Sequence, residues 1–174
     1  MLFRSLFVAV WPADDVLEQV AALARPDVRG LRWTSPDQWH VTLRFFGEAD
    51  LDEVAAVFGR IDLGSTGETV AELGPVTGRF GQRVLHVPVE GLERLARATV
   101  RATKAVGKPP ERRRFSGHLT LARVRGIGVD LRPFTGQPLA GRWPVRQLTL
   151  VRSRLGAGEG RAASYEVVER LALP

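Results

Sequence analysis

The chain has 174 residues, no cysteine and a formal net charge of +6, with 44% hydrophobic and 25% charged residues. This length suits one domain with a substantial core, or two small lobes that share a core. The absence of cysteine excludes disulfides, thiolate metal sites and a cysteine nucleophile, and no apolar run approaches the roughly 20 residues of a membrane-spanning helix.

The positive charge indicates an anionic partner without identifying it. Arginine carries most of the charge, since Lys104 and Lys108 are the only lysines. A basic surface favours a polyanion such as RNA, and the run of arginines over 112–114 either meets such a backbone or is a solvated face. A genome that favours arginine explains the same composition, so charge alone supports a nucleic-acid partner only weakly.

The first half of the chain predicts a strand, a helix and a second strand. The apolar stretch over 6–10 is typical of a buried strand rather than a signal peptide, because no small-residue cleavage pattern follows it. Residues 14–25 have apolar side chains at helical spacing and acids in the first turn, so they predict a helix that Pro26 ends. After a linker that contains Trp33, residues 40–47 predict the second strand.

The second half repeats this order. Residues 83–89 predict a strand, residues 92–104 predict an amphipathic helix, and a further strand begins at residue 118. Corresponding elements of the two halves are about 78 residues apart, as the matching tetrapeptides at 40 and 118 show. The repeat predicts two lobes related by a pseudo-twofold axis, with the strands that begin at 40 and 118 in the centre.

The remaining segments complete an α+β or mixed α/β protein. Residues 48–61 predict a further helix, whereas 69–73, 147–153 and 165–173 predict strands. Residues 125–141 are rich in Gly and Pro and predict a loop. No separate linker or low-complexity tail divides the chain.

Two tetrapeptides carry the chemical signal: His-Val-Thr-Leu over 40–43 and His-Leu-Thr-Leu over 118–121. They use two of the three histidines of the chain. Side chains alternate between faces along a strand, so each His shares a face with its Thr while the apolar residues face the core. A single His-x-Thr is more often a structural strand histidine. Two of them in matching contexts favour a site in which both strands line one cleft.

Two imidazoles and two hydroxyls suit acid–base chemistry on a phosphodiester. Imidazole titrates near pH 6.5, so one of His40 and His118 can accept a proton from attacking water while the other donates one to the leaving oxygen. Thr42 and Thr120 can donate hydrogen bonds to the non-bridging phosphoryl oxygens. The symmetry of the motifs does not say which histidine is the acid. Two histidines without nearby carboxylates fall short of the usual metal ligand set, so we expect no metal and no other cofactor.

The residues beside the motifs are weaker candidates. Arg123 lies at an odd offset from the second histidine, so it could clamp a phosphate only if the strand bends or ends near Ala122. Arg44 shares the face of the first histidine by even spacing and is a candidate substrate contact or rim residue. Phe45 is a candidate stacking partner for an unpaired base, although an aromatic there is more often core. We expect His86, the third histidine, to be structural.

The two motifs and their flanks resemble the 2H phosphoesterase superfamily, and most closely its bacterial RNA 2′,3′-cyclic phosphodiesterase branch, historically called 2′-5′ RNA ligases. The resemblance covers nearly the whole chain. It is carried by residues 6–10, 32–47, 115–123 and 151–168. The chain departs from many relatives at Gly117, where they have a proline, and at His86, where they have an aromatic. Neither departure touches the two motifs.

The resemblance implies an α+β fold with two pseudo-symmetric lobes of antiparallel sheet, outer helices and an active-site cleft between the lobes. It implies a single domain over residues 1–174, built from related halves of about 1–80 and 81–174. We expect a cytoplasmic enzyme that does not bind membranes, and nothing in the sequence demands more than a monomer.

The resemblance also implies a reaction: metal-independent hydrolysis of a 2′,3′-cyclic phosphate on an RNA 3′ end or a nucleotide, which leaves a 2′-phosphomonoester. By this resemblance His40 protonates the O3′ leaving group and His118 activates water, while Thr42, Thr120 and Arg123 hold the phosphoryl oxygens. Two alternatives stay open. One is cleavage or joining of 2′-5′ linkages at the same site, and the other is a non-catalytic module that binds RNA ends.

Overall fold

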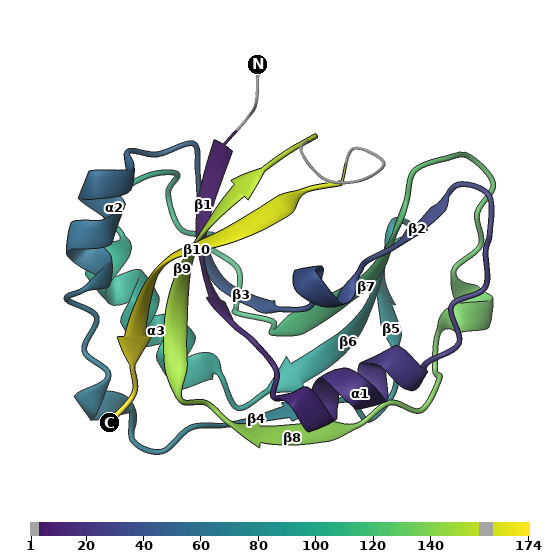
Figure 1. Cartoon of the computed structure of the whole chain (residues 1–174), viewed down its shortest axis with the longest axis horizontal. Coiled ribbons are helices and arrows are strands. Elements are labelled where there is room, and N and C mark those ends of the chain that lie inside the picture. Colours follow the sequence, from purple (N-terminus) through teal and green to yellow (C-terminus); the bar gives the residue numbers. More distant parts are fainter. Residues whose placement is uncertain (1–3, 157–161) are drawn as a thin grey trace.

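The computed structural model describes residues 4–156 and 162–174. Within these residues an antiparallel sheet of ten strands forms the centre of the protein, and helices lie on its outside (Figure 1). The strands are β1 (Arg4–Val10), β2 (Leu31–Trp33), β3 (Val41–Gly47), β4 (Val70–Leu73), β5 (Gly78–Phe80), β6 (Val84–Glu90), β7 (His118–Val124), β8 (Gly141–Pro144), β9 (Gln147–Arg154) and β10 (Ser164–Ala172). This architecture confirms the predicted α+β class.

The helices of the described residues are short. The α-helices are α1 (Asp14–Ala22), α2 (Leu51–Phe58) and α3 (Glu93–Thr103), and the 3₁₀ helices are η1 (Pro36–Gln38), η2 (Gly64–Thr66) and η3 (Arg132–Phe134). None of the described helices is long and apolar enough to cross a membrane.

The sheet divides into two lobes that meet where β3 pairs with β7. Its main path is β10-β9-β1-β3-β7-β6-β4-β8, while β2 pairs with β7 and β5 with β6. The β3–β7 register joins Val41 to Leu119, which are the equivalent residues of the two His-x-Thr motifs. This pairing brings the equivalent residues of the two motifs together where the lobes meet. The pseudo-twofold axis itself stays a prediction.

Each lobe contains elements from both halves of the sequence. Helices α2 and α3 lie together on the β3 side, whereas α1 packs against β8 at the other lobe (Figure 1). Strand β9 pairs with β1, and β4 pairs with β6. The description of the chain as one domain with related halves over 1–80 and 81–174 stays a prediction.

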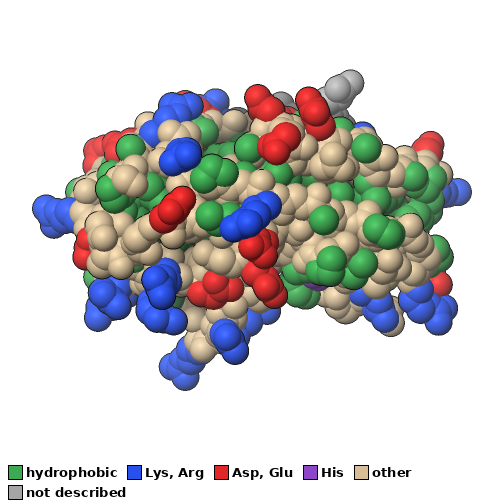
Figure 2. Space-filling model, turned by 90° about the horizontal axis from the view of Figure 1, so that it is seen from below, with side chains coloured by type: hydrophobic (Ala, Val, Ile, Leu, Met, Phe, Trp, Pro, Cys, Tyr) green, Lys and Arg blue, Asp and Glu red, His purple; other side chains and the backbone are tan. Residues whose placement is uncertain are grey.

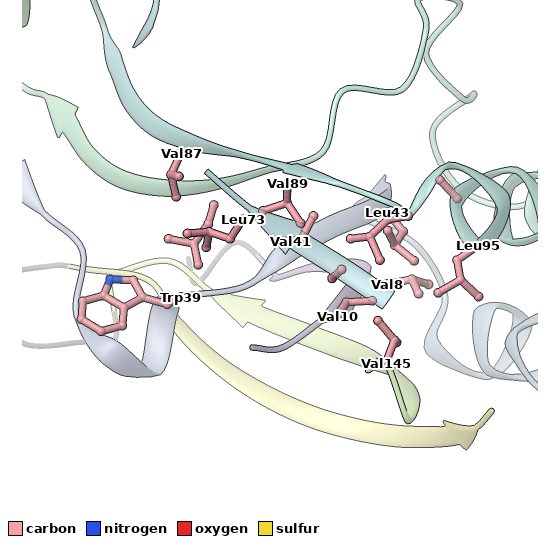
Figure 3. Close-up of a cluster of buried hydrophobic side chains, with 14 of the residues drawn as sticks. Val8, Val10, Trp39, Val41, Leu43, Leu73, Val87, Val89, Leu95 and Val145 are labelled. Carbon is pink, nitrogen blue, oxygen red and sulfur yellow. The ribbon is translucent and has the colours of Figure 1, made fainter. Parts of the chain in front are cut away.

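One buried core runs through both lobes and fixes the direction of the motif strands. Val41 and Leu43 of β3 lie with Val8 of β1 and Leu95 of α3 in this core (Figure 3). Burial of such a side chain stabilises the fold by about 1.5–3 kcal/mol. The apolar residues of each motif are buried and the His and Thr residues stay partly accessible, which confirms the predicted separation into a core face and a polar face.

Several predicted boundaries differ from the structure. Helix α1 ends at Ala22 rather than at residue 25, since Leu23 already has an extended backbone. Helix α2 begins only at Leu51, because the Asp50 carboxylate caps it by accepting the Glu53 amide at 3.0 Å. The sequence also misses β2, β5 and β8, which have three or four residues each and are too short for an alternation pattern.

Candidate active site

The two His-x-Thr segments lie side by side in antiparallel register. The pairing of Val41 with Leu119 places His40 across from Thr120, and Thr42 across from His118. All four polar side chains line one cleft of about 410 Å³. The structure therefore brings together the two histidines and two threonines that the sequence singles out.

Each imidazole is tied to a backbone carbonyl two residues before it. The distance from Nδ1 to the carbonyl oxygen is 2.7 Å for His40 and Gln38, and 2.9 Å for His118 and Ser116. A carbonyl oxygen only accepts hydrogen bonds, so Nδ1 carries the hydrogen in both rings and the neutral ring keeps its lone pair on Nε2. The His40 Nε2 lies 3.1 Å from the Thr42 Oγ1.

Three aromatic rings surround the first histidine. The ring centroid of His40 lies 4.9 Å from Phe7, 5.2 Å from Trp11 and 5.1 Å from Tyr165. The Trp11 indole is fixed by donating a 2.8 Å hydrogen bond to the Thr149 hydroxyl. Because these rings come from β1, from the segment after it and from β10, they exclude water from His40 on several sides.

Burial makes both imidazoles weak bases. It lowers the pKa of His40 from 6.5 to about 4; the Gln38 carbonyl opposes this, whereas positive charge on His118 and Arg123 adds to it. Burial also lowers the pKa of His118. The Ser116 carbonyl opposes this shift, whereas the positive charge of Arg123 adds to it. In the free protein both rings are therefore neutral at pH 7, and an anion in the cleft would favour their protonated forms.

A β-bulge brings Arg123 to the cleft. Thr120 and Ala122 of β7 pair with consecutive residues of β6, so Leu121 is an extra residue. The extra residue shifts the alternation of side chains by one position. Arg123 therefore lies on the same face as His118 and lines the cleft. The bulge is the strand irregularity that its odd offset from His118 made necessary.

An equivalent bulge corrects the prediction for Arg44. Thr42 and Arg44 of β3 pair with consecutive residues of β1, so Leu43 is the extra residue. The prediction that Arg44 shares the face of the first histidine is wrong. Its side chain is buried, with 4% exposure, and donates three hydrogen bonds of 2.7 to 3.2 Å to backbone carbonyls. Phe45, at the position equivalent to Arg123, lines the cleft instead and is 47% exposed.

The cleft carries positive charge. Arg32 and Arg125 line it together with Arg123, and none of the described lining residues is Asp or Glu. Sequence reasoning misses Arg32 and Arg125 as site residues. Strand β2 brings in Arg32 by pairing it with Arg123. Among residues 4–156 and 162–174, no three His, Cys, Asp or Glu side chains form a group that could hold a metal ion. The charge and volume suit an anion the size of a nucleotide.

His86 lies buried next to the second histidine and outside the cleft lining. Its ring stacks on Phe80 with a centroid distance of 3.9 Å, and it lies 5.7 Å from the His118 ring. The side chain is 8% exposed. Burial, with positive charge on His118 as a second cause, lowers the pKa of His86 to about 4. This environment fits the structural role expected for His86.

We expect the protein to lose stability as the pH falls from about 6.5 to about 4. An unfolded histidine takes up a proton near pH 6.5, whereas folded His86 does so only near pH 4, so the unfolded state binds more protons in this window. One such group lowers the free energy of unfolding by roughly 3 kcal/mol over the window. Urea unfolding at pH 7 and pH 4 measures this loss. The variant His86→Phe should lose correspondingly less, and an equal loss in both proteins would contradict the assignment.

Comparison with known proteins agrees with the motifs. The family model described as LigT like Phosphoesterase matches residues 10–70. An RNA 2′,3′-cyclic phosphodiesterase of Bacillus subtilis (strain 168) is 31% identical to this chain over 116 residues. That match covers 59% of this chain and 61% of the Bacillus protein, so it spans less than two thirds of the relative's length.

Solved structures match the chain from end to end. A crystal structure from Thermus thermophilus has a TM-score of 0.76 and 26% identity and covers 97% of both chains. The crystal structure of E. coli LigT complexed with 3′-AMP has a TM-score of 0.73 and 25% identity and covers 99% of both chains. The matched segment 10–70 contains the first His-x-Thr motif, and the shared fold contains both. In sequence and in fold the chain is thus similar to LigT-like phosphoesterases.

Proposed function

We propose that this protein hydrolyses 2′,3′-cyclic phosphates on RNA 3′ ends or nucleotides to 2′-phosphomonoesters, by histidine acid–base catalysis and without a metal ion. The observation that carries the proposal is the paired arrangement of His40 and His118. Each ring is held through Nδ1 by a backbone carbonyl, so Nε2 is the atom that can exchange a proton with the substrate. Each ring also lies across from a threonine in a positively charged cleft, and the His40 Nε2 contacts the Thr42 hydroxyl.

In the proposed reaction the cyclic phosphate lies between the two imidazoles. The Nε2 of neutral His118 takes a proton from a water molecule as the water oxygen bonds to phosphorus. The bond between phosphorus and O3′ breaks, and the Nε2–H of protonated His40 gives its proton to O3′. Water is thereby added across the broken bond, and the product has a 2′-phosphate and a free 3′-hydroxyl. The two proton transfers leave the histidines with exchanged protonation states, which solvent resets.

The negative charge of the substrate favours the protonated form of His40 that the reaction needs. The pKa of His40 is about 4 in the free protein, so its acid form depends on the phosphodiester anion beside it. In the proposal Thr42 and Thr120 donate hydrogen bonds to the non-bridging oxygens, and Arg123 adds positive charge where negative charge grows in the transition state. Phe45 remains a candidate surface for the base of the terminal nucleotide.

Two relatives support the substrate class. The Bacillus relative is described as an RNA 2′,3′-cyclic phosphodiesterase, and E. coli LigT has been crystallised with 3′-AMP, a nucleoside monophosphate. In this proposal a monomer suffices for activity.

The test is an assay of a short RNA that ends in a 2′,3′-cyclic phosphate, incubated with the protein in the presence of EDTA. We expect ring opening, with the phosphate found on O2′ by phosphorus NMR. A 3′-phosphate product would contradict the assignment of O3′ as the leaving group. Tight binding of unchanged RNA would favour the non-catalytic module, and faster turnover of a 2′-5′ dinucleotide than of the cyclic phosphate would favour 2′-5′ chemistry.

A further inference from the structure

Helix α3 carries a row of cations on one exposed side. Arg94, Arg97, Arg101 and Lys104 are all exposed, and their steps of three and four residues place them on one face of the helix. Within the described parts of the chain, no ion pair joins any of the four to a carboxylate. At 1.5 Å per residue, the row is about 15 Å long.

The helix that corresponds to α3 in the sequence repeat has the opposite charge. Helix α1 exposes Asp14, Asp15 and Glu18, and its nine residues contain no Lys or Arg. Figure 2 shows both acidic and basic side chains on the face seen from below, with several basic ones towards the left end and lower edge. The two corresponding helices therefore differ in the charge of their exposed sides.

The row leads to the edge of the cleft. Beyond the C-terminal end of α3, the Lys108 amide donates a 2.7 Å hydrogen bond to the carbonyl of Phe46, and the Lys108 carbonyl accepts one of 2.7 Å from Arg44. These bonds hold exposed Lys108 against β3, beside Phe45, which lines the cleft. The chain then continues to His118 through the exposed arginines at 112–114.

We propose that the exposed cations of α3 and Lys108, which we call the α3 track, bind the phosphates of the RNA strand that precedes the 3′ end held in the cleft. This inference rests on the proposed function and specifies its substrate as single-stranded RNA rather than a free cyclic mononucleotide. Contacts from Arg and Lys to phosphates are independent of base sequence and weaken with salt. The protein therefore selects its substrate by length and not by sequence.

The test compares Arg97→Gln/Arg101→Gln with a control that removes the same charge elsewhere, Arg146→Gln/Arg170→Gln. All four residues are exposed. For a ten-nucleotide RNA with a cyclic phosphate end, we expect the α3 variant to lose roughly tenfold in kcat/KM at low salt. The slope of log kcat/KM against log salt concentration should become shallower by about 1.4, or 0.7 for each lost phosphate contact. For a nucleoside 2′,3′-cyclic phosphate, both variants should match the wild type.

Other results would overturn either the α3 track or the proposed function, and the assays separate these two cases. If the control variant loses as much activity on the RNA as the α3 variant, the effect is due to net charge alone and the proposal is overturned. If the α3 variant loses as much activity on the mononucleotide as on the RNA, the proposal is also overturned. If the wild type opens neither substrate, the proposed function fails, and the track is then tested by fluorescence anisotropy with a labelled ten-nucleotide RNA. Weaker binding by the α3 variant than by the control would support the track, and equal binding would overturn it.

Discussion

Replacing His118 with alanine is expected to lower kcat for the opening of a 2′,3′-cyclic phosphate by about 10²–10⁴-fold, the usual contribution of a positioned acid or base. The variant His40→Ala should show a loss of the same size. In the proposed mechanism each imidazole transfers its proton through the Nε2 of a ring fixed at Nδ1. Initial rates on a nucleoside 2′,3′-cyclic phosphate measure both losses.

The two histidines should act as a unit. The double variant His40→Ala/His118→Ala is expected to be little slower than the slower single variant, because neither proton transfer is useful without the other. The control is His86→Phe, which removes the remaining imidazole, 5.7 Å from His118 and outside the cleft lining. This variant should keep a rate close to that of the wild type. A wild-type rate in either single alanine variant would contradict the roles given to the two histidines.

The pH dependence should separate the free protein from its substrate complex. In the proposed mechanism, the active form of the free protein has His40 protonated and His118 neutral. Burial lowers the pKa of both groups, that of His40 to about 4. We therefore expect kcat/KM to be highest below pH 6.5 and to fall by about tenfold per pH unit above it.

The optimum of kcat should lie at higher pH than that of kcat/KM. A bound phosphodiester is an anion beside both rings, so it stabilises the imidazolium and raises both pKa values. Initial rates at several substrate concentrations between pH 4 and 9 give both profiles. A kcat/KM optimum above pH 7.5 would show that the free cleft does not hold the histidines in the desolvated state described above.

The polar face of each motif was predictable because it depends on local geometry alone. Alternation along a strand places His40 with Thr42 and His118 with Thr120, and the burial of the apolar residues between them confirms it. The repeat also predicts the central place of the two strands. The Val41–Leu119 pairing agrees with this, since it brings the equivalent residues together.

The residues after the threonines could not be placed from the sequence. Their direction depends on the bulges at Leu43 and Leu121, which are visible only in the pairing with β1 and β6. The bulges bury Arg44 against the expectation, place the candidate contact Phe45 in the cleft lining, and satisfy the condition set for Arg123. A one-residue change in register moves every following side chain to the other face, so even spacing in the sequence is not sufficient evidence of a shared face.

Other contributors to the site come from distant segments. Trp11 and Tyr165 lie against His40 only because β1 and β10 flank β9 in the sheet. Arg32 reaches the cleft through the three-residue strand β2. No pattern within these segments indicates such contacts, because they follow from the order of strands. Their effect on the pKa of His40 was therefore outside the reach of sequence reasoning.

In the proposed mechanism, one cleft uses two equivalent histidines in opposite protonation states. Turnover of a nucleoside 2′,3′-cyclic phosphate in EDTA, measured side by side for the wild type, His40→Ala and His118→Ala, tests it most directly. We expect turnover by the wild type and a loss of at least about 100-fold in each variant. Turnover that survives unchanged in either variant, or no turnover by the wild type, would contradict it.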